Sequence, residues 1–207
     1  MEAIKPYKKS FEYSYTLGAF PTIELIKNAP EQVLQVIVSP ELEDRATITE
    51  LCNEYRISMI ESKKQIERLS DKENVYIIGV FRKFEKELSK KAPHIVLVNP
   101  SNMGNLGTII RTAIGFGIHD IAMIEPAADI YNPKVVRASM GALFHMNFKY
   151  FDSFEAYAAK YEGHEFFPFM LDADKTLVPG IYQGEKPFSL IFGNEATGLD
   201  ERFHGYG

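Results

Sequence analysis

Residues 94–113 read HIVLVNPSNMGNLGTIIRTA. The run Ile95–Val98 is continuously apolar, which is typical of a strand buried on both faces of a parallel sheet. A loop rich in asparagine and glycine follows it, and Asn105–Phe116 has the apolar spacing of a helix. Strand, polar loop and helix in this order predict a βα unit. The loop then lies at the carboxyl end of the strand, where open α/β sheets bind their ligands.

The rest of the C-terminal half continues the alternation of apolar runs and helical patterns. We expect further strands at Ile118–Ile124, His145–Phe151, Glu165–Leu171 and Ser189–Phe192, and helices at Lys134–Leu143 and up to Tyr161. Asp152 and Glu155 have the spacing of a capping box at the start of the last helix. Five strands separated by helical connections predict a doubly wound parallel sheet.

The N-terminal half shows a second, smaller alternation. Strands are expected at Val33–Val38, Ile57–Ile60 and Val75–Phe81, and helices at Pro21–Asn28, Leu42–Tyr55 and Lys63–Leu69. Residues 82–92 are expected to form a connecting helix or linker that ends at Pro93. The chain is therefore divided into a small α/β domain with a basic linker, 1–91, and a larger parallel-sheet domain, 92–207.

Composition places the chain among soluble globular proteins. It has 207 residues, of which 45% are hydrophobic, and one cysteine, Cys52. A single cysteine cannot form an internal disulfide, and this suits a reducing compartment. The N-terminus has no apolar signal segment, and no run reaches the length of a membrane span. We therefore expect a cytoplasmic protein that does not enter a membrane.

The charge leaves nucleic-acid binding open. The net charge is −5, which disfavours a polyanionic partner, but residues 1–91 are neutral and the acidity lies in 92–207. Two basic clusters stand out, at Lys5, Lys8 and Lys9 and at Arg82, Lys83, Lys86, Lys90 and Lys91. An RNA-contacting surface and a solvated face with Glu85 and Glu87 interspersed are equally compatible with the second cluster.

A second polar loop follows the last expected strand. It reads Phe192-Gly193-Asn194-Glu195-Ala196-Thr197-Gly198-Leu199. Arg111 is a permanent charge in an otherwise apolar helix, so it pairs with an acid or faces a cavity that holds an anion. Glu195 is the candidate partner. A ligand site with an arginine, a glutamate and asparagines, and a purely structural ion pair, both fit this pattern.

Several common site motifs are absent. There is no phosphate-binding G-x-x-x-x-G-K-[ST] loop, no G-x-G-x-x-G after the first strand, and no G-x-S-x-G elbow. The five histidines lack the spacing of metal ligands, so no metal is expected. The residues by themselves do not name a reaction.

Three segments together resemble the SpoU (TrmH) branch of the SPOUT RNA methyltransferases. The first is Asn99-Pro100-x-Asn102-x-Gly104-Asn105-x-Gly107-x-Ile109-x-Arg111-Thr112-Ala113, which resembles that family's first motif. The second is Arg137-Ala138-Ser139-Met140-Gly141-Ala142-Leu143, and the third, Phe192–Leu199, resembles its second motif. Their order and spacing agree with the family. Residues 30–85 resemble, more loosely, the ribosomal-protein-L30e-like substrate-binding domain that often precedes it.

The resemblance implies an α/β protein with an L30e-like domain followed by a SPOUT-type domain with a C-terminal trefoil knot. The activity implied is methyl transfer from S-adenosylmethionine to an RNA ribose 2′-OH, without a metal, in a homodimer. Ribosomal RNA is favoured over transfer RNA as the partner. The implied catalytic residues are Arg111, Asn105 and Glu195. The implied cofactor-binding residues are Leu171, Asp172, Ala173, Phe192, Gly193, Asn194 and Gly198.

The chain departs from the family at its end. The family's third motif, an isoleucine-proline pair followed by a Ser-Leu-Asn-rich helix start, should follow soon after Gly207 and close the knot. We expect the sequence to be an incomplete form of a longer protein, the alternative being a natural fragment without activity. The alternatives are a SpoU-like protein that binds RNA without methylating it, a transfer-RNA 2′-O-methyltransferase, and an unrelated doubly wound enzyme that uses a nucleotide.

Overall fold

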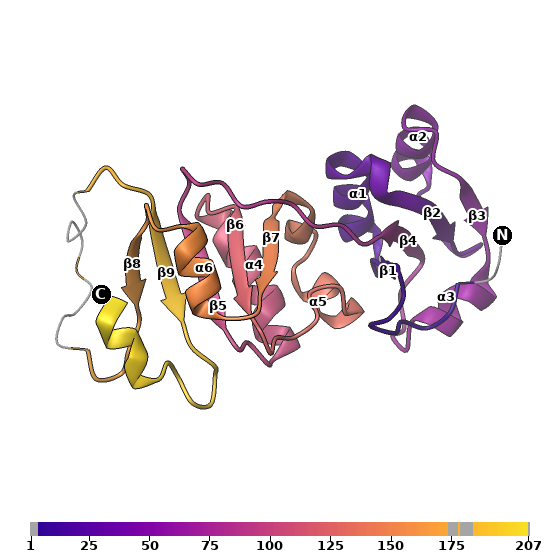
Figure 1. Ribbon diagram of the computed structural model, residues 1–207. Coiled ribbons are helices and arrows are strands. Elements are labelled where there is room, and N and C mark those ends of the chain that lie inside the picture. The colour runs from indigo at the N-terminus through magenta and orange to yellow at the C-terminus, as the bar shows by residue number, and fades with distance from the viewer. Residues whose placement is uncertain (1–3, 174–177, 179–183, 207) are drawn as a thin grey trace. The chain divides into compact units, whose positions relative to one another are not determined.

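The computed structural model describes residues 4–173, 178 and 184–206. These form two α/β units, each built from separate segments of the chain (Figure 1). The N-terminal unit contains the residues up to Phe84 together with Met103–Arg111 and Asp129–His145. The C-terminal unit contains Glu85–Asn102, Thr112–Ala128 and the residues from Met146 onward. The expected division at residue 91 into two continuous domains stays a prediction.

The N-terminal unit is a four-stranded mixed sheet with helices on both faces. Its strand order is β1 (Tyr13–Tyr15), β4 (Ile77–Arg82), β2 (Val33–Val38) and β3 (Met59–Glu61). Strand β4 runs antiparallel to β1 and β2, whereas β2 and β3 are parallel. The helices are α1 (Ala19–Asn28), α2 (Ala46–Glu54) and α3 (Lys63–Leu69), with a 3-10 turn, η1, at Pro30–Gln32.

Alternation along the strands divides the apolar side chains of this unit into two cores. Val36, Val38 and Ile77 pack against side chains of α1 and α2. Ile37 and Ile78, which point to the other face, pack against α3. The period of two in the sequence therefore determines which helices cover which face.

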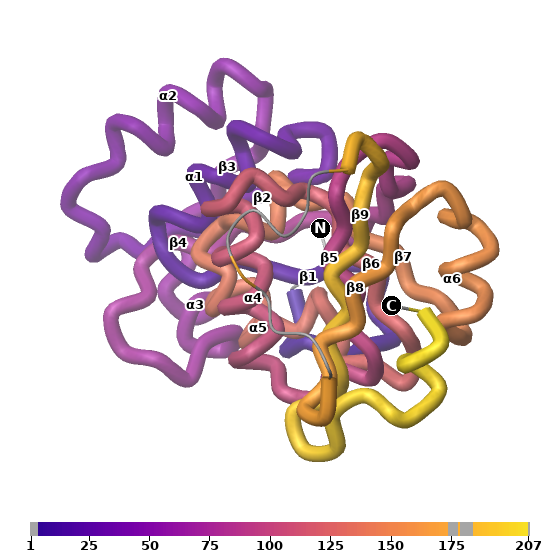
Figure 2. Tube along the Cα trace, turned by 90° about the vertical axis from the view of Figure 1, so that its left-hand side faces the viewer, coloured from indigo at the N-terminus to yellow at the C-terminus, as the bar shows by residue number. Residues whose placement is uncertain are grey.

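The C-terminal unit is a fully parallel five-stranded sheet, as predicted. Its strand order is β7 (Asn147–Phe151), β6 (Asp120–Ile124), β5 (His94–Val98), β9 (Phe188–Phe192) and β8 (Glu165–Pro168). Figure 2 shows β5, β9 and β8 side by side. Helix α6 (Phe154–Lys160) and the 3-10 helix η3 (Glu201–Tyr206) pack on one face, over Val96, Val98, Ala122, Ile124 and Ile191.

Three further elements, two helices and a 3-10 turn, contain residues of the sequence motifs. Helix α4 (Met103–Gly115) follows β5, and its residues are shared between the two units. Helix α5 (Pro133–Ala138) and a 3-10 turn, η2 (Ala142–His145), belong to the N-terminal unit. The predicted single helix Lys134–Leu143 is wrong at its end, because Met140 and Gly141 adopt positive φ values of 50° and 84° and break the helix.

Two helix starts also differ from the prediction. Helix α2 begins at Ala46 and not at Leu42, because the Arg45 guanidinium donates hydrogen bonds to the carbonyl oxygens of Leu42, Ser39 and Pro40 and holds a turn there. The cap of α6 is Ser153 and not Asp152. The Ser153 backbone is extended, and its Oγ accepts a hydrogen bond from the Ala156 amide at 3.2 Å.

The segment predicted as a connecting helix or linker is non-helical and is held in the C-terminal unit from Glu85 onward. The Leu88 side chain is buried in the core under α6. The Ser89 amide donates to Asp120 Oδ1 at 2.7 Å, and Glu87 forms ion pairs with Lys149 and Lys160. Three of the five residues in the basic cluster, Lys86, Lys90 and Lys91, therefore lie on a segment with its own fixed packing.

Candidate active site

The loops after β5 and β9 meet at one edge of the C-terminal sheet. The two strands are parallel neighbours, so their carboxyl ends lie together. The Glu195 carboxylate joins the loops. One of its oxygens accepts hydrogen bonds from the Ser101 amide at 3.2 Å and the Ser101 hydroxyl at 2.9 Å, and the other accepts from the Asn102 amide at 3.1 Å.

The charge of Glu195 is stabilised by these donors. Burial tends to raise the pKa of its carboxyl, but hydrogen bonds from its own backbone, Ser101 and Asn102 outweigh burial and leave the pKa below the ordinary value. Glu195 is therefore a carboxylate at neutral pH. Its donors in the other loop are two backbone N–H groups, which residue type does not reveal, and the Ser101 hydroxyl, which was not predicted from the sequence.

Asn194 and the two glycines of the second loop fix its shape. Asn194 Nδ2 donates to the Asn99 carbonyl at 2.7 Å, while its Oδ1 accepts from the Ala196 amide at 2.8 Å. The Gly198 amide donates to the Asn194 carbonyl at 2.9 Å, and Gly198 has a φ of 70°. A Cβ on Gly193 would lie 2.1 Å from the Gly198 carbonyl carbon, so no other residue fits there.

The first loop is anchored on its other side. Asn99 adopts a positive φ of 52°, and its Nδ2 donates to the Glu125 carbonyl at 2.8 Å. The Ala128 amide donates to the Pro100 carbonyl at 2.7 Å. Since Asn194 and Glu195 hold the same loop from β9, residues 99–102 are tied to both neighbouring strand ends. Two loops with separate places in the chain thus form one rigid polar surface.

Asn105 and Arg111 lie on α4, directly after this loop. Leu106 and Ile110 form the buried side of the helix, and Asn105 and Arg111 are exposed. Thr108 lies between them at three-residue spacing, so these side chains form one exposed row. Both residues belong to the part of α4 in the N-terminal unit, and the predicted pairing of Arg111 with Glu195 stays a prediction.

The expected cofactor-binding residues follow two adjacent strands, β8 and β9. Leu171, Asp172 and Ala173 are exposed after β8, and the Leu171 side chain is 104% exposed. The ring of Phe169 stacks on that of Phe192 at a centroid distance of 4.6 Å and an angle of 16°. The carboxylate of Asp172 lies 3.2 Å from His204 Nε2. Leu171 and Phe169 therefore form an exposed apolar surface next to Phe192, the first residue of the second polar loop. Such a surface suits a ligand that has a planar ring and a polar end.

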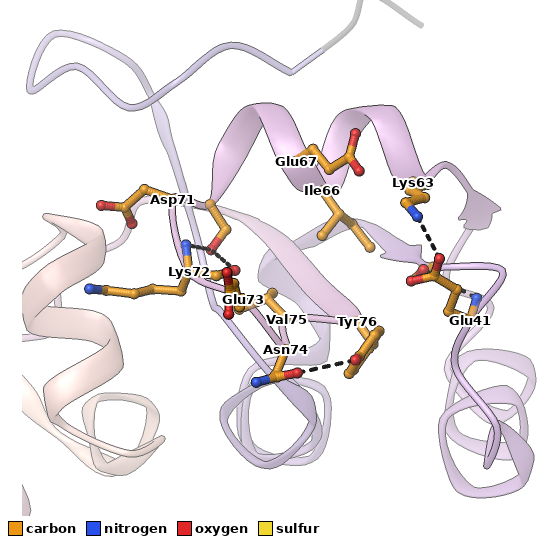
Figure 3. Close-up of a pocket in the computed structure, with 12 residues that line it drawn as sticks. Glu41, Lys63, Ile66, Glu67, Asp71, Lys72, Glu73, Asn74, Val75 and Tyr76 are labelled. Carbon is orange, nitrogen blue, oxygen red and sulfur yellow. Dashed lines mark hydrogen bonds and ion pairs between the residues drawn. The ribbon is translucent and has the colours of Figure 1, made fainter.

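A surface hollow in the N-terminal unit is chemically different (Figure 3). It is lined by the end of α3 and the following loop, with Glu41, Glu67, Asp71 and Glu73 among its side chains. Lys63 forms an ion pair with Glu41 at 2.5 Å. The acidic majority disfavours a phosphate or RNA ligand, so the hollow does not compete with the strand-end loops as the candidate site.

No helix within residues 4–173 or 184–206 is long and apolar enough to cross a membrane. No group of three or more His, Cys, Asp or Glu side chains in that same part of the chain is placed to hold a metal ion.

The fold and the loops define an α/β protein with a parallel C-terminal sheet and a candidate ligand site at the carboxyl ends of its strands. A sequence model of the SpoU rRNA Methylase family matches residues 92–205, which include both loops and α4. The chain belongs to this family.

Curated relatives are similar over part of their length. The 23S rRNA (guanosine(2553)-2′-O)-methyltransferase RlmP of Bacillus subtilis is 30% identical over 126 residues, 56% of this chain and 46% of the relative. The 23S rRNA (uridine(2479)-2′-O)-methyltransferase of Streptomyces viridochromogenes is 42% identical over 52 residues, 25% of this chain and 18% of the relative. The chain thus aligns with less than half the length of either relative.

Solved structures share the fold at lower identity. An rRNA methyltransferase from Sinorhizobium meliloti has a TM-score of 0.76 and 21% identity, and the match covers 95% of this chain and 76% of that one. The SpoU methyltransferase AviRb from Streptomyces viridochromogenes, in complex with AdoMet, has a TM-score of 0.74 and 21% identity, covering 94% of this chain and 78% of that one. These matches confirm the predicted α/β fold with a parallel sheet.

Proposed function

We propose that this chain carries the site of an S-adenosylmethionine-dependent RNA methyltransferase that acts on a ribose 2′-OH, with ribosomal RNA as its substrate. The main observation behind the proposal is the set of hydrogen bonds from Ser101 and Asn102 to the Glu195 carboxylate. These bonds connect the two family motifs at the carboxyl ends of β5 and β9. Family membership and the names of the relatives support the reaction type.

The chemistry of the β8 and β9 ends fits the cofactor. The stacked Phe169 and Phe192 rings and the exposed Leu171 offer an apolar surface to an adenine ring, and the residues of 171–173 and 192–194, with Gly198, offer backbone donors and acceptors. S-adenosylmethionine held by these residues would supply a methyl group bonded to a positively charged sulfur, which is a good leaving group.

Arg111 is the residue that we assign to the 2′-oxygen. A guanidinium stays protonated at any working pH, so it cannot accept the hydroxyl proton. It can stabilise the negative charge that develops on the oxygen as the proton passes to water, or hold the neighbouring phosphate. Asn105, on the same exposed row of α4, is suited to orienting the ribose by hydrogen bonds. Glu195 acts on the loop that leads into α4.

The finer features implied by the family remain part of the proposal. They are the trefoil knot, the homodimer, the L30e-like character of residues 30–85 and the division into 1–91 and 92–207. A second candidate substrate is transfer RNA. A structure that concerns 2-OH methylation of C/U34 on tRNA is 27% identical, with a TM-score of 0.50 over 56% of this chain. A SpoU-like protein that binds RNA without methylating it is the third candidate.

The test is methyl transfer from labelled S-adenosylmethionine to unmodified total RNA, with digestion to nucleosides and mass spectrometry. A 2′-O-methylnucleoside establishes the reaction, and fractionated ribosomal and transfer RNA identify the substrate class. Arg111→Ala should abolish transfer and leave cofactor affinity within a few-fold. Arg56→Ala, an exposed arginine of the N-terminal unit, is the matched control. Cofactor binding without any product would favour the non-catalytic candidate.

A further inference from the structure

The segment before β1 is held in a fixed conformation on the edge of the N-terminal sheet. Strand β1 is the edge strand and pairs only with β4 among the described strands. The Tyr13 hydroxyl accepts a hydrogen bond from the Lys5 amide at 3.0 Å and donates one to the Lys5 carbonyl at 3.2 Å. The Lys83 ammonium donates to the Lys9 carbonyl at 2.8 Å. Residues 5–12 therefore form a structured loop that leads into β1.

This loop presents aromatic rings among positive charges. The rings of Phe11 and Tyr13 stack at a centroid distance of 5.1 Å and an angle of 21°, and both are half-buried. Tyr13 is paired in register with Arg82 on β4, so the two side chains project from the same face of the sheet. Lys5, Lys8, Lys9 and Arg82 are exposed.

The charges of this surface are available to a ligand. Among the residues that the structure describes, Lys5, Lys8, Lys9 and Arg82 form no ion pair with a carboxylate. Glu12 is the acid within the loop. Four cations around a stacked aromatic pair are the combination with which proteins hold single-stranded nucleic acid, since bases stack on the rings and phosphates meet the cations.

We propose that Lys5, Lys8, Lys9, Phe11, Tyr13 and Arg82 form a binding surface for single-stranded RNA, with bases stacked on the Phe11–Tyr13 pair. This aromatic-basic surface belongs to the N-terminal unit, whereas the loops proposed to carry catalysis belong to the C-terminal unit. The choice of RNA over another polyanion rests on the proposed function. The surface would hold an unpaired segment of the substrate and would add affinity without base-specific contacts.

The test is the fluorescence anisotropy of a labelled oligouridine of about 12 nucleotides, within the range of known single-strand sites. It is titrated with the whole chain, without cofactor, at several salt concentrations. Phe11→Ala should weaken binding at least about fivefold, since base–aromatic stacking contributes roughly 1–3 kcal/mol per base. Lys8→Ala/Lys9→Ala should also weaken binding and lower the slope of log K against log salt by about 1.4, at about 0.7 per single-strand phosphate.

Matched controls change the same residue types elsewhere in the unit. Phe20→Ala removes a phenylalanine of α1 that is 55% exposed, and Lys27→Ala/Arg56→Ala removes two exposed cations near α1 and α2. Both should bind like the wild type. If Phe11→Ala lowers the melting temperature, Phe11→Leu keeps the apolar packing and removes the aromatic face, and it should still bind more weakly.

The proposal is overturned if the wild type fails to bind the oligouridine at low salt, or if the Phe11 variants bind as the wild type does. It is also overturned if the lysine pair and its control give the same salt slope. Because this assay contains no cofactor, its result is independent of methyl transfer. A wild type that methylates RNA, with Phe11 variants of unchanged RNA affinity, would refute this surface and leave the proposed function standing.

Discussion

Glu195 accepts three hydrogen bonds from Ser101 and Asn102, and the nature of these donors predicts the effects of substitutions. Glu195→Gln keeps one acceptor oxygen but turns an NH₂ donor toward N–H or O–H donors of Ser101 and Asn102. Hydrogen bonds to a charged group contribute about 1.5–3 kcal/mol, so we expect a lower melting temperature and at least roughly tenfold slower methyl transfer. Ser101→Ala leaves both amide bonds and should cost less in both measurements. Equal losses in the two variants would contradict this ranking.

His94 predicts a pH dependence of stability. Its side chain is fully buried, with Nδ1 2.8 Å from the Tyr157 hydroxyl and Nε2 2.7 Å from the Ser89 carbonyl. Burial lowers the pKa of His94 from 6.5 to about 4. Between these values the unfolded chain binds more protons than the folded one, so the stability that is complete above pH 6.5 is lost as the pH falls toward 4.

Urea unfolding at pH 7 and pH 5 measures this effect of His94. The shift corresponds to a loss of about 2 kcal/mol at pH 5. His94→Gln removes the titrating ring. The difference in the free energy of unfolding between pH 7 and pH 5 should therefore shrink by about that amount, even though the variant is less stable at pH 7. His119→Gln changes an exposed histidine and should keep the wild-type difference. An unchanged difference in His94→Gln would show that the ring is protonated in the folded state.

At the scale of elements, two glycines of α4 predict opposite effects of one substitution. A Cβ on Gly107 would lie 2.4 Å from the Ala138 Cβ and 2.8 Å from the Val135 carbonyl oxygen, where α5 crosses the helix. Gly107→Ala should therefore destabilise by about 1–3 kcal/mol through overpacking. Gly115 has no atom within 4 Å of its Cβ position, so Gly115→Ala should be neutral or stabilise by up to about 1 kcal/mol. Thermal unfolding of both variants measures the two changes in stability. Equal changes would contradict the close contact of α4 and α5.

The elements that the sequence predicted best are those whose signal is local. Val33–Val38 and Lys63–Leu69 have the predicted bounds, because the first segment is apolar except at Gln35 and the Ser62 hydroxyl caps α3. Strand β1 was not predicted, since a three-residue edge strand is defined by its pairing with β4 and not by its own pattern. The start of α2 was missed because the Arg45 contacts that delay it involve carbonyl groups, which every residue has.

The candidate site shows the same division between local and distant signals. The sequence predicted both loops at strand ends, and the structure brings 99–102 against 194–195 because β5 and β9 are neighbouring strands. The hydrogen bonds of Glu195 with Ser101 and Asn102 could not be predicted, because charge pairing gives no information about backbone amides or a serine hydroxyl. A backbone donor is equally present at every non-proline position, and its direction is set by the fold.

At the scale of the whole molecule, the N-terminal unit is completed by segments from the second half of the chain. Phe81 is fully buried, and its ring lies 5.2 Å from that of Phe144, edge to face, and 6.0 Å from that of Tyr131. The Ser14 hydroxyl donates to the Tyr131 carbonyl at 2.6 Å. These contacts imply that a fragment ending at residue 91 leaves part of its sheet uncovered.

Phe81→Ala tests this dependence when it is made both in the whole chain and in a fragment of residues 1–91. In the whole chain it should cost about 3–5 kcal/mol of unfolding free energy, as for other buried phenylalanines. In the fragment Phe81 lacks Tyr131 and Phe144, so the cost should be smaller by at least about 1 kcal/mol.

Ile37→Ala is the control, because Ile37 packs against Ile66, Leu69, Ile78 and Val80, all of which the fragment retains. Its cost should be the same in both contexts. Equal costs of Phe81→Ala in chain and fragment would mean that residues 1–91 fold as an independent domain, whereas a fragment without a cooperative transition is the extreme form of the dependence on residues 129–145.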